Sequence, residues 1–286
     1  MKQKIAIVTD SSSSLDYIPH NYDDIFMVRM PIMFGDVEYI DGVTMTVDEF
    51  YNRIVNDTII PTTAQPSLGE TLELYETLKA KGYTDIIHYP ISKGLSGTYQ
   101  SLFSIKDMVE GINVHIIDTK STALILGFIV LEAAKMVAED KTVEEIKCYS
   151  EYLVQSFKPY FMVDDLKYLI KNGRLSNAAG FIGSVLKIKP ILTFNEEGQI
   201  IGTDKIRTSK KAMNHIIESV LNDTKDCKKV KYFISYGKDE ELIDTFKSQV
   251  AEYIDLNEVF ESILPSVIGA HVGSGIVALG YFILEK

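Results

Sequence analysis

Short apolar segments alternate with helix-like segments through the first half of the chain, and this alternation most constrains the fold. The expected strands are residues 4–10, 25–34, 85–92 and 113–118. Strands of a parallel sheet are almost uniformly apolar because helices cover both of its faces. The first half is therefore predicted to be a parallel α/β sheet with helices on both faces.

Capping residues mark two of the expected helices. Thr46 with Glu49 three residues later has the spacing of a capping box. Ser67 with Glu70 starts a second helix, which Gly82 ends. Three further helices are expected, at residues 97–109, 121–140 and 142–157.

The pattern changes after residue 157. Two β-like runs flank residues 195–199, where Gly198 is available for a positive φ, and this predicts a hairpin. Two amphipathic helices flank another apolar run, and the chain ends in a buried strand. We therefore expect two domains: residues 1–157, an α/β domain with a parallel sheet, and residues 158–286, an α/β domain with a mixed sheet.

Composition excludes several classes of function. The net charge is −11 and no large Lys/Arg cluster is present, which argues against nucleic-acid binding. The start does not have the pattern of a signal peptide, and the longest apolar run, residues 123–131, is about half a membrane span. Cys148 and Cys227 stand alone in the sequence. We expect a cytoplasmic protein with no integral membrane segment and no metal or cofactor.

Three loops of the first half carry hydroxyl groups where strands are expected to end or helices to begin. They are residues 9–15, 61–67 and 92–98. Ligands of parallel α/β sheets bind beyond the carboxyl ends of the strands, and helix starts accept anions. Ser and Thr are also common helix caps, so each loop alone leaves both interpretations open. The three together favour an anion site.

The chemistry expected of these loops is binding. Gly97 directly follows Ser96, so the esterase spacing G-x-S-x-G fails, and no P-loop pattern is present. His271 lies among glycines, which let the backbone approach a ligand closely; a structural turn histidine is the alternative. We find no convincing nucleophile–base pair, metal set or nucleotide loop, and therefore expect a carrier and not an enzyme.

Four blocks read together point to a family. They are IVTDSSSSL, PTTAQPS, ISKGLSGTYQS and IGAHVGSGIVALGY, with LKYLIKNGRLSNAAGFIGSVLKIKPIL between the last two. In this order, over the whole chain, they resemble the DegV family of bacterial fatty-acid-binding proteins. The resemblance implies a two-domain α/β protein that holds one long-chain fatty acid between its domains. It also implies a partner, a separate ATP-dependent fatty acid kinase, which makes an acyl phosphate for phospholipid synthesis.

The resemblance also implies site residues. It places the carboxylate of the fatty acid at Thr63, Ser96 and His271, and we expect further contacts from Thr62, Gly97 and Thr98. Arg174, in a loop expected to be exposed, matches a family arginine linked to docking the kinase. Ala64 stands where the family often has serine, so one hydroxyl is absent.

The tail of the acid is expected to dominate binding. About fifteen carbons at ~0.8 kcal/mol per buried methylene offer ~12 kcal/mol before association costs, so neutral donors suffice for the head group. Residues 123–131 and 177–192 are expected to line the tunnel, although ordinary core is equally consistent with them. Two alternatives stay open: an acyl hydrolase using Ser96 and His271, and a sensor or binding module for another amphiphilic acid.

Overall fold

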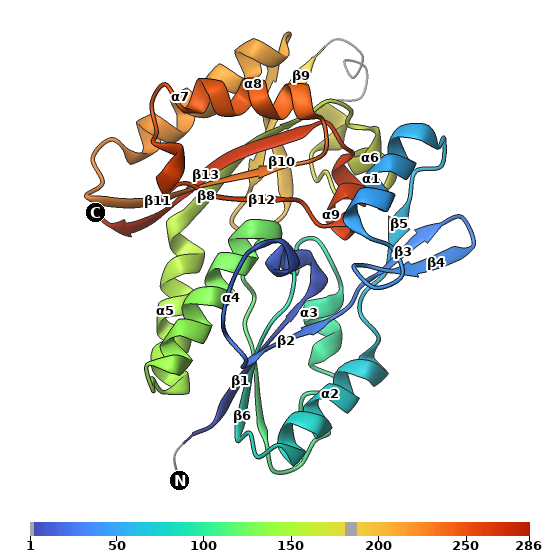
Figure 1. Cartoon of the computed structure of the whole chain (residues 1–286), viewed down its shortest axis with the longest axis vertical. Helices are drawn as coiled ribbons and strands as arrows, with labels where there is room; N and C mark the ends of the chain where they lie inside the picture. Colours follow the sequence, from blue (N-terminus) through green and yellow to red (C-terminus); the bar gives the residue numbers. More distant parts are fainter. Residues whose placement is uncertain (1–2, 181–187) are drawn as a thin grey trace.

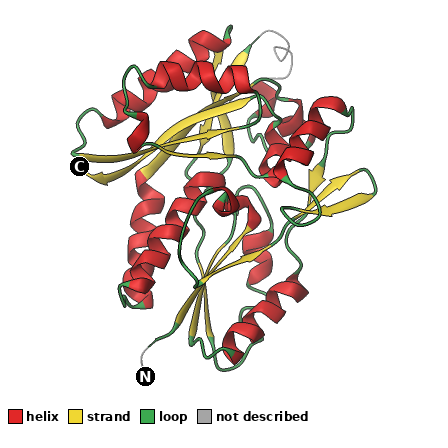
Figure 2. Cartoon of the chain, in the orientation of Figure 1, coloured by secondary structure: helices red, strands yellow, loops and turns green. Residues whose placement is uncertain are grey.

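The computed structural model describes residues 3–180 and 188–286. A four-stranded sheet forms the part of the molecule nearer the amino terminus, and a six-stranded sheet forms the opposite part (Figure 1). Helices flank the smaller sheet on both sides, and two long helices cover the outer face of the larger one (Figure 2). Within these residues, no helix is both long and apolar enough to span a membrane.

The four-stranded sheet is parallel, as the sequence predicts. Its order is β2 (Ile25–Val28), β1 (Ile5–Asp10), β6 (Asp85–Tyr89) and β7 (Asn113–Ile116). On one face, alternate strand residues pack against α4 (Ala123–Ala138) and α5 (Val143–Ser156). On the other face they pack against α2 (Leu68–Ala80) and α3 (Thr98–Leu102). Both faces are therefore covered, which explains the uniformly apolar strands.

The expected strand at residues 25–34 was wrong as a single element. It divides into β2 and β3 (Pro31–Phe34), and β3 joins a separate antiparallel sheet with β4 (Val37–Ile40) and β5 (Thr62–Thr63). The chain leaves the first sheet at Met30, whose backbone N–H donates to Ser11 Oγ. Pro31 follows with no N–H to continue the ladder. Helix α1 (Val47–Asn56) starts at the Thr46–Glu49 capping box that the sequence predicts.

The six-stranded sheet is mixed. Its order is β10 (Ile200–Ile206), β9 (Lys189–Phe194), β8 (Phe157–Val163), β13 (Ile276–Glu285), β11 (Lys229–Tyr236) and β12 (Phe260–Ile263). Only β11 and β12 pair in parallel. The β9–β10 hairpin is present, and Gly198 in its turn has φ +71°. Helices α7 (Ser209–Thr224) and α8 (Glu240–Val250) cover the outer face, and the short helices α6 (Lys167–Lys171) and α9 (Ser266–Val272) lie toward the first half.

One expected helix differs from the structure. The helix predicted for residues 97–109 ends at Leu102, because the Ser104 hydroxyl and N–H both donate to the Ser101 carbonyl and tighten the chain into turns. In the segment expected to line a tunnel from residue 177, the structure has a 3₁₀ turn at Ala178–Gly180. Residues 181–187 lie outside the described part of the chain.

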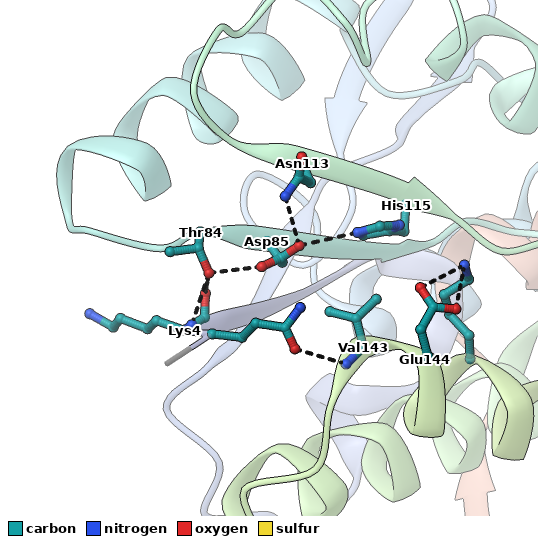
Figure 3. A network of polar contacts seen from close by, with 9 residues as sticks. Lys4, Thr84, Asp85, Asn113, His115, Val143 and Glu144 are labelled. Carbon is teal, nitrogen blue, oxygen red and sulfur yellow. Dashed lines mark hydrogen bonds and ion pairs between the residues drawn. The ribbon is translucent and has the colours of Figure 1, made fainter. Parts of the chain in front are cut away.

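A polar network ties the amino-terminal ends of the first sheet together. Asp85, 3% exposed, accepts hydrogen bonds from Thr84 and Asn113, and His115 Nε2 lies 3.3 Å from its carboxylate (Figure 3). The backbone N–H of Lys4 donates a hydrogen bond to Thr84 Oγ1. Asp85 therefore has partners at both carboxylate oxygens, and the role of this network is structural.

We keep the division into residues 1–157 and 158–286, where α5 passes into β8, as a proposal.

Candidate functional site

The side chains of Thr63 and His271 meet across the two halves of the molecule. Thr63 lies on β5, paired with Ile32 of β3, and His271 lies in the last turn of α9. His271 Nε2 and Thr63 Oγ1 are 2.8 Å apart, a hydrogen-bond distance. The fold thus brings together two of the three residues expected at the carboxylate.

The His271 ring is neutral at physiological pH. Burial, and after it the nearby charge of Arg174, lower the pKa of His271 to about 4. Its Nδ1 is buried and has no hydrogen-bond partner among the described residues. A neutral imidazole has one N–H donor and one acceptor nitrogen. The neutral ring therefore does not repel the Arg174 cation. Its Nε2 is hydrogen-bonded to Thr63, and its Nδ1 remains without a partner among the described residues.

Ser96 lies on the wall of the same cavity, in the loop between β6 and α3. Its Oγ accepts from the Thr98 N–H at 3.2 Å and lies 2.9 Å from Thr98 Oγ1. These bonds fix the position of the Ser96 hydroxyl. The hydrogen-bond partner of His271 Nε2 is Thr63 and not Ser96. The structure thus shows no hydrogen-bonded Ser96–His271 pair of the kind that a serine hydrolase needs.

Arg174 is half-buried and lines the cavity with Ser96 and His271. This differs from the exposed loop position that the sequence indicates. Its Nε donates to the Leu95 carbonyl at 2.9 Å, and its Nη1 donates to the Asn172 carbonyl at 2.6 Å. A guanidinium has five N–H groups, so these two bonds leave three without a partner among residues 3–180 and 188–286. A cation with unused donors therefore stands beside three neutral polar groups.

The polar residues line a cavity that adjoins an apolar one. The head cavity, of ≈ 60 Å³, contains Thr63, Ser96, Arg174 and His271. The tail cavity, also ≈ 60 Å³, is walled almost entirely by aliphatic and aromatic side chains, among them Leu124, Phe161, Phe194, Phe233 and Leu264. The two cavities share Thr122, Ile200, Ile268 and Val272. The two cavities are therefore adjacent, one with polar groups on its wall and the other almost entirely apolar, and we call the pair the channel.

The other expected site residues have different positions. Thr62 is exposed and does not line the head cavity, because successive strand residues point to opposite faces. Thr98 is buried and is hydrogen-bonded to Ser96 Oγ, and Gly97 is exposed and lines a surface depression. Ala64 lines the cavity and brings no hydroxyl there.

Two polar residues of the channel were missed from the sequence. Gln65 lines the head cavity, and its Oε1 accepts from the Ser101 hydroxyl at 3.0 Å. Thr122 lies where the two cavities join, immediately before α4. Gln65 belongs to the PTTAQPS loop, so that loop was the available signal. For Thr122 the position just before an apolar helix indicates a cap, and nothing in the sequence distinguishes that role from a channel wall.

Asp41 lies beneath the amino-terminal turn of α9, the helix that carries His271. It is 1% exposed, and neither carboxylate oxygen has a hydrogen-bond partner among the described residues. Burial raises the pKa of Asp41 to about 6, and the nearby hydroxyls of Ser11 and Ser266 offset part of this effect. The charge of Asp16 raises the pKa of Asp41 further, and the charge of Arg29 lowers it. An ionised Asp41 therefore destabilises the folded chain at neutral pH, because its charge is buried without a hydrogen-bond partner among the described residues.

We expect Asp41→Asn to change how stability depends on pH. The pKa of Asp41 is higher in the folded chain than the ~3.9 of an unfolded Asp. Its protonation therefore stabilises the fold fully below pH ~4, and that stability is lost as pH rises through about 6. The free energy of unfolding of the wild type relative to Asp41→Asn should fall by about 2 kcal/mol between about pH 4.5 and about pH 7.5. Urea unfolding of both proteins at the two pH values measures this difference. An equal change in the free energy of unfolding of the two proteins would show that burying the Asp41 carboxylate does not destabilise the fold.

Comparisons with known proteins show which protein family the chain is related to. The model of the family described as "Uncharacterised protein, DegV family" matches residues 4–284. A DegV domain-containing protein of Staphylococcus aureus strain N315 is 38% identical over 97% of both chains.

Solved structures agree with this result. A fatty acid binding DegV family protein from Streptococcus agalactiae is 30% identical, with a TM-score of 0.90 over 98% of this chain and 99% of that one. DegV, a fatty acid binding protein from Bacillus subtilis, is 33% identical, with a TM-score of 0.84 over 98% of this chain and 99% of that one. The family model, the relative and the solved structures lead to one conclusion: the chain belongs to the DegV family.

Proposed function

We propose that this protein binds one long-chain fatty acid in the channel between its two halves. The carboxylate contacts Thr63, Ser96, Arg174 and His271, and the acyl tail extends into the tail cavity. The observation that carries the proposal is that a head cavity with polar groups lies against an apolar tail cavity and shares four wall residues with it. The fatty acids bound by the DegV proteins of S. agalactiae and B. subtilis support it.

The physical balance supports an acid with a long tail. Each buried methylene contributes ~0.8 kcal/mol, and association costs at least several kcal/mol. A chain of about fifteen carbons exceeds that cost before any head-group contact is made. The two cavities are narrow, with room for about four water-sized groups each at 10–15 Å³ per group. Apolar side chains around the channel must therefore move apart as the tail enters.

We expect Ser96→Ala and His271→Ala to weaken head-group binding and to leave the fold intact. Each removes one hydrogen bond to a charged carboxylate, worth ~1.5–3 kcal/mol, so the dissociation constant should rise roughly tenfold to a hundredfold. Thr62→Ala, in the same loop as Thr63 but exposed, is the matched control and should bind like the wild type. Titration of delipidated protein with a fluorescent fatty acid measures the four dissociation constants, of the wild type and the three variants. Equal affinity in all four proteins would place the carboxylate elsewhere.

We further propose that the loaded protein presents the carboxylate to a separate ATP-dependent fatty acid kinase in the cytoplasm. A surface depression of ≈ 560 Å³ adjoins the head cavity and shares Leu95, Ser96 and Arg174 with it. The carboxylate therefore has a short path to the outside at this point. Arg174 contributes to this surface, where we place the docking of the kinase. Conversion of bound acid to acyl phosphate by a purified fatty acid kinase and ATP tests the partner.

Mass spectrometry of an organic extract tests the binding function. Protein purified without added lipid should yield about one long-chain acid per chain on denaturing extraction. A different amphiphilic acid in that amount would favour the sensor alternative. A lipid-free extract together with no uptake by the protein on titration would refute the proposal.

A further inference from the structure

The tail cavity has an outer wall at Phe194. The four residues that it shares with the head cavity mark the end that faces the carboxylate. Pro159 and Phe194, the latter the cross-strand partner of Ile200, line both the tail cavity and a surface depression of ≈ 430 Å³. That depression also includes Lys120, Phe157 and Lys158. The half-buried Phe194 ring therefore stands between the tail cavity and the outside.

This wall is held in place from several directions. Phe194 is the last residue of β9, and its ring packs 6.2 Å from the ring of the buried Phe161. The turn that follows is fixed by Asn195, whose Oδ1 accepts from the N–H groups of Glu197 and Gln199 at 3.0 and 2.9 Å. The turn is also tied to the first half of the chain, because Ser92 Oγ donates to the Gly198 carbonyl at 2.9 Å. Moving the backbone of the turn outward would break these hydrogen bonds, and rotating the ring would break its contact with Phe161.

We propose that Phe194 sets the longest acyl chain that the protein holds. The inference rests on the proposed function, with the carboxylate fixed at the head cavity. A chain whose terminal methyl reaches the ring gains about fourfold in affinity for each buried methylene. A longer chain must displace the ring or withdraw its carboxylate from the head cavity. Without the ring, the tail cavity opens into the depression, and a longer tail continues along the aliphatic stems of Lys120 and Lys158.

Competition among acids of different length tests the inference. Delipidated protein is loaded from an equimolar series of straight-chain acids, in steps of two carbons from lauric to behenic acid, and the retained acids are quantified by mass spectrometry. The wild type should show a sharp upper limit to the chain length of the acids that it retains. In Phe194→Ala, and in the milder Phe194→Leu, retention of the first acid beyond that limit relative to palmitic acid should rise about tenfold or more. Phe157→Ala removes a ring that lines the depression only, and it should keep the wild-type limit.

Each other result contradicts the inference. If the wild type loads acid and both Phe194 variants keep its limit, Phe194 is not the wall, while the proposed function stands. If Phe157→Ala shifts the limit as far as Phe194→Ala does, length is not set at Phe194. If no protein takes up any acid from the series, the proposed function fails and the inference fails with it.

Discussion

Replacing Gly198 by alanine should lower the free energy of unfolding by about 3 kcal/mol and release the bound acid. Gly198 has φ +71°, a left-handed conformation that costs a residue with a Cβ ~1–2 kcal/mol. A Cβ at this position would also overlap Ser92 Oγ and approach Lys120 Cα to 2.8 Å. Such overpacking costs typically ~1–3 kcal/mol more. The turn would be pushed away from the first half of the chain, and it carries Phe194 and Ile200, two residues of the channel wall, at its ends.

Gly35→Ala is the matched control for this variant. Gly35 has φ +64°, but nothing lies within 4 Å of the position that its Cβ would take. It should therefore show the conformational cost alone, ~1–2 kcal/mol, and retain the acid. Urea unfolding and quantification of extracted acid measure both effects. Equal losses of stability in the two variants, with the acid retained in both, would show that the contact between the Gly198 turn and the first half contributes nothing to the channel.

Charge reversal at Arg174 should abolish tight binding of the acid. The substitution removes charged donors from the head cavity, ~1.5–3 kcal/mol, and sets one carboxylate beside another. Two like charges about 4 Å apart repel by several kcal/mol when partly buried, at an effective dielectric constant of ~20. The dissociation constant of Arg174→Glu should therefore rise by about a thousandfold or more. Arg174→Gln, which removes the charge without reversing it, should show a smaller loss of roughly tenfold to a hundredfold.

The same pair of variants separates two roles of Arg174. Both lose the hydrogen bonds to the carbonyls of Leu95 and Asn172, so their stabilities are compared by thermal unfolding and their affinities are measured on folded protein only. If Arg174→Glu keeps wild-type affinity but no longer supports acyl phosphate formation by the kinase, Arg174 acts in docking alone. Its place in the head cavity would then have no part in binding.

Features that depend on a few neighbouring residues were predicted well. The Thr46–Glu49 capping box and the positive φ of Gly198 are present because the interactions that determine them lie within one turn. The parallel and mixed sheets follow from the apolar patterns of whole strands. The break between β2 and β3 was missed, because it depends on Ser11 accepting from Met30 N–H, a contact with a loop 19 residues away.

The channel was harder to predict because its residues come from distant segments. Thr63 and His271 are 208 residues apart, and only the packing of α9 beside β3 and β5 brings them together. A resemblance to a family named both residues, whereas spacing alone gave no reason to pair them. The direction of the Arg174 side chain depends on the carbonyls of Leu95 and Asn172, which no local pattern reveals.

The ¹³C NMR spectrum of carboxyl-labelled oleic acid bound to the delipidated protein tests the central claim most directly. Donors around a carboxylate favour its charged form. The account predicts one narrow bound resonance per chain, constant in position from about pH 7.5 down to about pH 4.5, where an ordinary carboxyl group with a pKa of ~4–5 is about half protonated. The resonance should move in His271→Ala. A bound resonance that titrates like a carboxyl group in water, and that is unchanged in His271→Ala, would contradict a carboxylate held at Thr63, Ser96, Arg174 and His271.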